Sequence, residues 1–312
     1  MGRDGKPVPY EAFTVSPTHF HFVISPPETD TRNISYLISS ISYLSNPMIT
    51  TKRQNTLEYL VSSEISVPHA FTTRFGGVST GFLASLNLTV GRGDTLENVE
   101  ENIRILGKTV GFDPEKMVLT RQIHSDLVRV VTEADCLGLC HQVYPQCDGL
   151  VTNTPGLSLM VFTADCTPLL LWDPVTGAVG AAHAGWRGTA SDIAGKTVRK
   201  MQEAFGCNPA DIRAAIGPNI GFCHFETGSD VPQAMLASFG SDVEPFLRPA
   251  GEKYYVDLKE INRYALNRAG VVSVDISTAC TMCSPDRFWS HRATQGVRGA
   301  QGAVIQCKEV RP

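Results

Sequence analysis

Apolar residues recur every three or four positions in four stretches, which predicts four helices. The clearest covers 95–111: Val99, Ile103, Leu106 and Val110 form one stripe, Asp94 or Thr95 is placed to cap it, and Gly111 to end it. The same reasoning predicts helices over 189–206, 230–240 and 257–270, each followed or closed by a glycine.

Strand patterns fill most of the space between these helices. Residues 117–132 alternate on either side of His124, and 148–166, 167–186, 211–221, 271–277 and 302–307 contain short apolar runs bounded by turn residues. Residues 56–65 fit either a short helix or a strand. Strands and helices do not alternate strictly, and no complete G-x-G-x-x-G is present. We therefore expect an α+β fold with mixed or antiparallel sheets, and no dinucleotide site.

Residues 1–47 differ from the rest of the chain. They contain six prolines and a serine- and isoleucine-rich run, without a capped helix or a clear hairpin. We predict that 1–47 is a loose N-terminal extension or a misassigned start, and that 48–312 is a single domain. A peripheral segment packed on the core is the alternative.

Composition excludes several classes of protein. Apolar residues make up 42% and charged residues 19%, the net charge is −4 and the pI is near 6.1. No basic surface for nucleic acid, no apolar run that could cross a membrane and no signal-peptide core is evident. Nine cysteines, an odd number, indicate reduced thiols and a cytoplasmic location. The sequence carries no signal for an oligomeric state.

Three residues stand out for chemistry: His124, Cys166 and His183. Forty-two residues separate the first two and 17 the last two, so only the fold can bring them together. They are core residues, a nucleophilic cysteine with a histidine base, or ligands of one metal. One thiolate and two imidazoles are a good set for Zn²⁺, and three protein ligands leave a fourth position open, as in catalytic zinc sites.

Two arginines lie in segments suited to binding an anion. Arg187 begins a helix after "HAGW", and Arg74 stands beside two glycines and several hydroxyls in "TRFGGVSTG". Taken singly, each arginine is equally compatible with a surface ion pair.

Several blocks carry a family resemblance: "HAFTTRFGGVSTG", "TRQIHSDLV", "CDGLVTNTPGLSLMVFTADCTPLLLWD", "GAVGAAHAGWRGT", "AAIGPNIGFCHFETG" and "RFWSHRATQG". In this order, over roughly 68–305, the chain resembles the bacterial laccase-domain family, long labelled multicopper polyphenol oxidase and now described as purine nucleoside phosphorylase. The resemblance implies a three-layer α/β/β sandwich. It also implies zinc ligands at His124, Cys166 and His183, with Cu²⁺ as a substitute ion.

The implied chemistry is phosphorolysis of adenosine, inosine and methylthioadenosine, together with deamination of adenosine. The partners would be a purine nucleoside and phosphate. We predict Cys166, Asp165 and Arg74 as catalytic residues and Arg74, Asn87 and Arg187 as substrate-binding residues. The chain departs from the family pattern at two places: His291 stands where tyrosine is usual, and Ala300 where arginine is common, with Arg298 two positions earlier.

Other functions remain open at this point. A cysteine hydrolase using Cys166 with a histidine base is the main alternative, since it needs no metal. A true laccase needs many histidines, and the only H-x-H lies at 19–21. "HFE" (224–226) with "CTMC" (280–283) matches a zinc deaminase or a redox pair weakly. A zinc loop over 135–147 and a non-enzymatic scaffold complete the alternatives.

Overall fold

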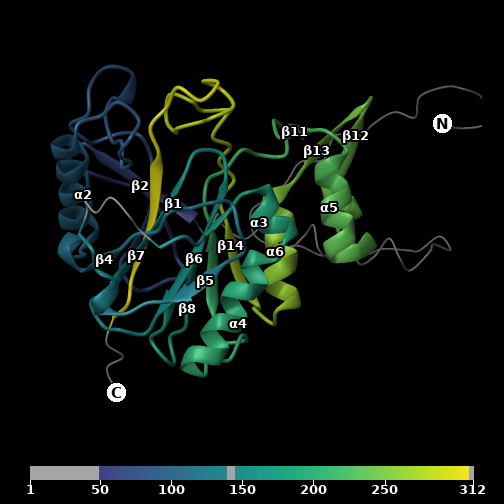
Figure 1. Cartoon of the computed structure of the whole chain (residues 1–312), viewed down its shortest axis with the longest axis horizontal. Coiled ribbons are helices and arrows are strands. Elements are labelled where there is room, and N and C mark those ends of the chain that lie inside the picture. The colour runs from purple at the N-terminus through teal and green to yellow at the C-terminus, as the bar shows by residue number, and fades with distance from the viewer. Residues whose placement is uncertain (1–48, 139–144, 309–312) are drawn as a thin grey trace, which may run out of the picture. The chain divides into compact units, whose positions relative to one another are not determined.

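The computed structural model describes residues 49–138 and 145–308. One six-stranded sheet has the order β1-β2-β3-β15-β7-β4 (Figure 1). Its strands are β1 Ile49–Gln54, β2 Leu57–Ser62, β3 His69–Thr72, β15 Gln301–Gln306, β7 Ser158–Thr163 and β4 Met117–Val118. β15, the last strand of the chain, lies between β3 and β7 and pairs with both in antiparallel fashion. The two ends of the described chain therefore meet in one sheet.

The second six-stranded sheet has the order β14-β10-β8-β9-β6-β5. Its strands are β14 Ser273–Ile276, β10 Arg213–Ile216, β8 Thr167–Trp172, β9 Val179–Ala184, β6 Gly149–Thr152 and β5 Val128–Val130. Each of these two large sheets is mixed. In the second, for example, β10 pairs with β14 in parallel and with β8 in antiparallel fashion. A small third sheet, β11-β13-β12, consists of β11 Glu226–Thr227, β13 Lys253–Val256 and β12 Leu247–Ala250.

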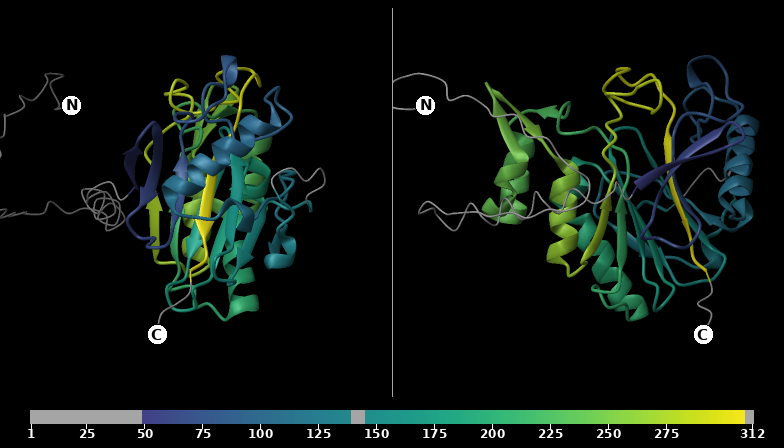
Figure 2. Two further views of the ribbon diagram at one scale, coloured as in Figure 1. Left: turned by 90° about the vertical axis from the view of Figure 1, so that its left-hand side faces the viewer. Right: turned by 180° about the vertical axis from the view of Figure 1, so that it is seen from behind.

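Three apolar clusters hold the layers together. One lies between the two large sheets and includes Phe71, Leu159 and Leu170. A second packs helices against the outer face of the β8–β9 sheet, as the two rotated views show (Figure 2). These helices are α3 Trp186–Ala190, α4 Ile193–Phe205 and α6 Leu258–Arg268, whereas α5 Asp230–Phe239 joins the same cluster by packing on α3 and β13. In the third cluster, Ile103 and Leu106 of α2 (Leu96–Val110) cover the outer face of the other sheet.

This arrangement confirms the predicted fold class of two mixed sheets with a helical layer. The helix predicted at 95–111 is α2: the Thr95 side chain accepts a hydrogen bond from the Asn98 N–H, and Gly111 ends the helix at φ 93°. Residues 56–65 form strand β2 rather than a helix.

The helix predicted over 189–206 is wrong in its first turns. The chain forms two helices there, because Asp192 adopts a left-handed φ of 60° and its side chain caps α4 by accepting from the Gly195 N–H. An aspartate in this conformation breaks the helix without the glycine that normally signals a break.

Residues 47–312 form one compact unit. The prediction for 1–47 and the histidines at 19–21 lie outside the described residues, and the extension remains a prediction. Within 49–138 and 145–308, no helix is both long and apolar enough to cross a membrane. The eight cysteines in this part of the chain are all free thiols.

Candidate functional site

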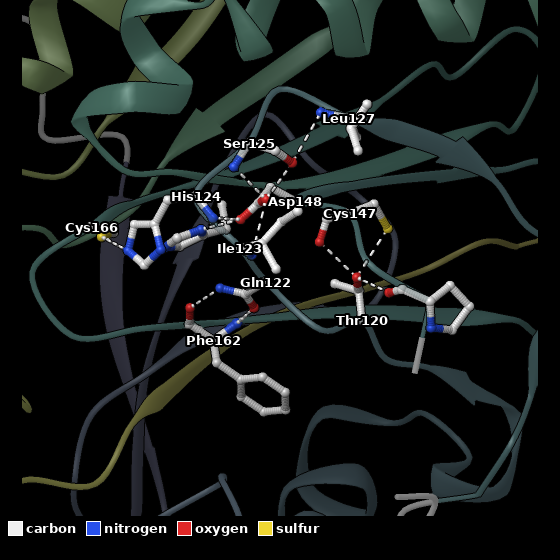
Figure 3. A network of polar contacts seen from close by, with 12 residues as sticks. Thr120, Gln122, Ile123, His124, Ser125, Leu127, Cys147, Asp148, Phe162 and Cys166 are labelled. Carbon is white, nitrogen blue, oxygen red and sulfur yellow. Dashed lines mark hydrogen bonds and ion pairs between the residues drawn. The ribbon is translucent and has the colours of Figure 1, made fainter. Parts of the chain in front are cut away.

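The three predicted ligands meet where both large sheets end. His124 lies in the loop between β4 and β5, Cys166 directly before β8, and His183 on β9. Cys166 Sγ is 3.8 Å from His124 Nε2, and the two imidazole centroids are 4.9 Å apart. One ligand atom from each residue lies within 4.8 Å of the others, so the fold brings together all three residues. Figure 3 shows Cys166 beside the His124 imidazole.

Asp148, which directly precedes β6, organises the loop between β4 and β5 that carries His124. Its carboxylate, which is fully buried, accepts hydrogen bonds from the backbone N–H groups of Ile123, His124 and Ser125, at 3.2, 3.1 and 2.7 Å. The same carboxylate lies 2.8 Å from His183 Nδ1. One buried side chain therefore orients both histidines, and it holds His124 at a left-handed φ of 59° (Figure 3).

Sequence reasoning missed Asp148. The residue stands in the quoted block "CDGLVT", and its position directly before a buried strand is the signal that was available. Aspartates that hold the second nitrogen of a metal-ligating histidine are common, since this bond fixes the ring and its tautomer. With Nδ1 engaged by Asp148, Nε2 of His183 is the nitrogen that faces the cluster.

The electrostatics favour a thiolate at Cys166. Burial alone raises the pKa of this thiol, but the charge of His183 and hydrogen bonds from both histidines lower it to about 6. For His183, burial lowers the pKa, whereas Cys166 and Asp148 raise it to about 9. Without a metal these two residues form an ion pair. The same thiolate is the form that ligates zinc or acts as a nucleophile.

Gly185 leaves the room that the cluster needs. A Cβ atom at this position would lie 2.8 Å from His124 Cδ2 and 3.4 Å from Cys166 Sγ. Any side chain here would therefore push the ligands apart. One thiolate and two imidazoles at this spacing, with the space that Gly185 leaves beside them, fit a Zn²⁺ ion with one free coordination position.

The cluster lines a cavity of about 650 Å³ between α2 and the two sheets. The apolar part of its wall consists of Leu88, Val90, Leu96, Val99, Ile103, Leu119, Phe162, Ala164 and Ala300. Three arginines, Arg92, Arg121 and Arg298, also line it. A mostly apolar cavity with a few charged groups is typical of a small-molecule site.

Two polar atoms on this wall have no partner. Among the described residues, Arg298 Nε and Thr163 Oγ1 belong to the few buried side-chain atoms without a hydrogen bond. Burial, followed by the nearby charge of Arg92, lowers the pKa of Arg298. None of the three cavity arginines forms an ion pair within 49–138 and 145–308. Cavity arginines without an ion-pair partner among the described residues leave a place for an anion.

Arg74 and Asn87 are not among the cavity-lining residues. The Arg74 guanidinium donates to the carbonyls of Ala84 and Pro285 at 2.9 Å each and stacks on Trp289 at 3.9 Å. Asn87 is fully buried, and its Oδ1 accepts from the N–H of Ala300, which is on the cavity wall. Asn87 therefore supports the cavity wall from behind.

The other predicted residues also lie beside the cavity rather than on it. Arg187 is exposed and stacks on Trp186 at 4.2 Å. Asp165 accepts from Thr281 Oγ1 at 2.6 Å and from the Arg292 N–H at 2.7 Å, so both carboxylate oxygens are engaged. Their predicted roles in substrate binding and catalysis stay predictions.

The two departures from the family pattern fall close to the site. Ala300 lines the cavity where the family commonly has an arginine, and Arg298 also lines it. The charge of Arg298 contributes, after burial, to a lowered pKa of His291. Arg298 was noted in the sequence only as part of a departure, and its place on the cavity wall is a finding of the structure.

The zinc loop considered at 135–147 is only partly described. Cys140 and His141 lie outside the described residues. Cys147 is buried, and its sulfur lies 2.9 Å from Thr120 Oγ1.

Comparison with known proteins shows the family to which the chain belongs. The chain belongs to the family described as multi-copper polyphenol oxidoreductase laccase, whose model matches residues 68–308. A purine nucleoside phosphorylase of Deinococcus radiodurans is 41% identical over 250 residues, covering 80% of this chain and 92% of that protein. The purine nucleoside phosphorylase YlmD of Geobacillus stearothermophilus is 37% identical over 245 residues, covering 76% and 89%.

A solved structure shares the fold. The crystal structure of the Bacillus licheniformis hypothetical protein YfiH matches with a TM-score of 0.77 at 31% identity, covering 83% of this chain and 99% of that one. The family and the fold inferred from the sequence blocks are thus confirmed.

Proposed function

We propose that this protein is a zinc-dependent purine nucleoside phosphorylase that also deaminates adenosine. One observation carries the proposal: the His124–Cys166–His183 cluster lines the same cavity as Arg298, whose buried Nε has no hydrogen-bond partner among the described residues. The curated relatives named purine nucleoside phosphorylase support an enzyme of this kind. Adenosine, inosine and methylthioadenosine are the substrates we expect, with phosphate as the second reactant.

The metal would be held by His124, Cys166 and His183, with Asp148 fixing the imidazole of His183. Zinc supplies a Lewis acid that lowers the pKa of water toward neutrality, and Cu²⁺ would bind the same donors as a substitute. The protein's own contribution is to keep Cys166 as a thiolate and to present Nε2 of His183 by engaging its Nδ1.

In phosphorolysis, a phosphate oxygen forms a bond to C1′ of the ribose while the glycosidic C–N bond breaks. The bonding electrons leave with the purine, which takes up the proton that the phosphate loses. In our proposal Arg298 and Arg92 hold the phosphate, because both guanidinium groups line the cavity and the charge of Arg92 acts on Arg298. The apolar wall around Phe162 and Ile103 receives the nucleoside. Water replaces phosphate in deamination: it adds at C6 of adenosine, and ammonia leaves.

Product analysis tests this assignment. Purified protein is given adenosine with and without phosphate, beside Arg298→Gln and the matched control Arg104→Gln, whose arginine is exposed on α2 and pairs with Glu101. We expect adenine and ribose 1-phosphate only with phosphate, and inosine in either condition. Arg298→Gln removes one charged hydrogen-bonding partner of phosphate, which is expected to cost about 1.5–3 kcal/mol. This corresponds to a loss of roughly 10- to 100-fold in kcat/KM for phosphate, which the control should not show. Free adenine without added phosphate, or equal losses in both variants, would refute it.

A second function follows from the ion pair of Cys166 with His183. A thiolate beside a histidine that is itself oriented by Asp148 has the composition of a cysteine hydrolase site. This alternative requires that metal-free protein be active and that zinc inhibit it. The phosphorylase requires the opposite response to zinc.

A further inference from the structure

A second group of thiols and an imidazole lies outside the cavity described above. Cys223 and His224 follow β10 in a turn, and Cys280 and Cys283 lie in the loop between β14 and β15. One ligand atom from each of the four lies within 4.8 Å of all the others. None of them lines the cavity, and the proposed function does not use them.

The spacing of these atoms matches a tetrahedral metal site. With Zn–S near 2.3 Å and Zn–N near 2.0–2.1 Å, tetrahedral geometry places two sulfurs about 3.8 Å apart and a sulfur and a nitrogen about 3.6 Å apart. Here the sulfurs of Cys223 and Cys283 are 3.6 Å apart. His224 Nδ1 is 3.2, 3.7 and 3.4 Å from the sulfurs of Cys223, Cys280 and Cys283.

We propose that Cys223, His224, Cys280 and Cys283 form a second, structural metal site that binds Zn²⁺. Three thiolates and one imidazole complete a four-coordinate shell without an open position, which is the composition of structural rather than catalytic zinc sites. Soft thiolate ligands select zinc over magnesium, calcium or manganese.

The surroundings of the cluster suit a bound metal with thiolate ligands. The Gly221 N–H donates to Cys280 Sγ at 3.1 Å, the type of outer hydrogen bond that stabilises a metal thiolate. Three thiolates around a divalent ion carry a net charge of −1. The buried ammonium of Lys259 donates to the carbonyls of Ser277 and Ala279, both at 2.7 Å, and so places a positive charge next to the loop that carries Cys280. The anionic centre would offset part of the cost of burying this cation.

Backbone contacts join the two loops without the help of a metal. Asn219 and Cys280 form a parallel bridge, and the Thr281 N–H donates to the Asn219 carbonyl at 2.9 Å. This pairing sets Cys223 and His224 opposite Cys280 and Cys283. Each loop on its own supplies only two ligands, so a metal would join two segments about 60 residues apart in the chain.

The same two loops hold Asp165, the neighbour of Cys166. The Ile220 N–H donates to the Asp165 carbonyl at 2.9 Å, and Thr281 Oγ1 donates to its carboxylate at 2.6 Å. Asp165 has a left-handed φ of 85°, which such contacts must maintain. The second metal would therefore stabilise the support of the first site without touching a substrate.

Metal content under reducing conditions tests the second site. Protein is reconstituted with excess Zn²⁺, desalted and assayed for zinc per chain, for the wild type, Cys166→Ala, Cys283→Ser and the control Cys136→Ser, whose cysteine lies outside both clusters. We expect two zinc ions in the wild type and the control, and one in each of the other variants. Co²⁺ bound to Cys166→Ala should show the strong sulfur-to-cobalt absorption of several thiolates, and Cys283→Ser should lose most of it.

X-ray absorption on the zinc-loaded wild type needs no variant and covers the case in which Cys283→Ser does not fold. Two sites, one with one sulfur ligand and one with three, average to two sulfurs per zinc, whereas the first site alone gives one. One zinc per chain in the wild type, or a single sulfur per zinc, would overturn the proposal. So would a disulfide between Cys223 and Cys283 in peptide maps of the zinc-loaded protein, because that would make these cysteines a redox pair.

Discussion

Replacing Asp148 by asparagine is the sharpest perturbation of the site, because it keeps the side chain's size and removes its charge. Each carboxylate oxygen accepts at least two hydrogen bonds: Oδ1 from the His124 N–H and His183 Nδ1, Oδ2 from Ile123 and Ser125. An amide offers only one acceptor oxygen. In either orientation, at least two donors lose their acceptor.

The magnitude follows from the pKa of the aspartate. Burial alone raises this pKa, but hydrogen bonds from His183 and Ser125 outweigh it and lower the pKa from the ordinary 3.8 to about 2. At about 1.36 kcal/mol for each pH unit, the charge stabilises the metal-free folded state by roughly 2 kcal/mol. Because the folded-state pKa lies below the unfolded-state value, this stabilisation is complete above about pH 4 and is lost as the pH falls through about 2.

Urea unfolding of metal-free protein measures this effect. We expect Asp148→Asn to lose roughly 2 kcal/mol of unfolding free energy near neutral pH, and the difference from wild type to shrink in acid. Competition with a coloured chelator should show zinc affinity at the first site reduced about 10- to 100-fold. Asp113→Asn is the matched control, because asparagine caps its short 3₁₀ turn as well as aspartate does. Loss of less than about 0.5 kcal/mol, or a difference independent of pH, would refute the reasoning.

Three further predictions concern the cavity and the cluster. Gly185→Ala should lower zinc affinity by at least about 10-fold in the same chelator assay, because its Cβ would meet His124 at 2.8 Å; unchanged affinity would contradict the packing. Thr163→Val should leave the urea midpoint nearly unchanged, because the hydroxyl has no partner to lose, while KM for nucleoside or phosphate rises; a large loss of stability with unchanged KM would argue against a ligand contact. In metal-free protein, iodoacetamide should alkylate Cys166 with a half-maximal rate at about pH 6, since its lowered pKa preserves the thiolate as the pH falls. Cys136, whose pKa burial and nearby Glu133 raise, should react only in more alkaline solution. Protection of both thiols alike by Zn²⁺ would contradict the assignment of Cys166 as a ligand.

The sequence predicted those parts of the fold that depend on local chemistry. The helix at α2 follows from its apolar stripe and its two caps, and the β8–β9 hairpin follows from the Asp-Pro-x-x-Gly turn between two apolar runs. Pairings between strands that are distant in the chain could not be predicted from the sequence. β6 and β7 are consecutive strands, yet they belong to different sheets, because β7 pairs with the last strand of the chain.

The candidate site also divides into residues that the sequence predicted and residues that it did not. Residue type and placement singled out His124, Cys166 and His183, and the family resemblance implied that they bind one metal, whereas spacings of 42 and 17 residues alone predicted no contact. Asp148 was missed and Arg298 was noted only as part of a departure, because the burial of the first and the unpartnered Nε of the second appear only in the packed structure. The "HFE" and "CTMC" stretches match a zinc deaminase only weakly. The contact of Cys223 and His224 with the "CTMC" loop depends on a bridge between loops that no local pattern encodes.

The most direct test of the account is phosphorolysis of adenosine by metal-free protein before and after Zn²⁺ is added, in the wild type and in Cys166→Ala. The account predicts no ribose 1-phosphate from the metal-free wild type, recovery on adding zinc, and no recovery in Cys166→Ala, whose site lacks its only thiolate. Full activity of the metal-free wild type, or recovery of Cys166→Ala by zinc, would contradict it.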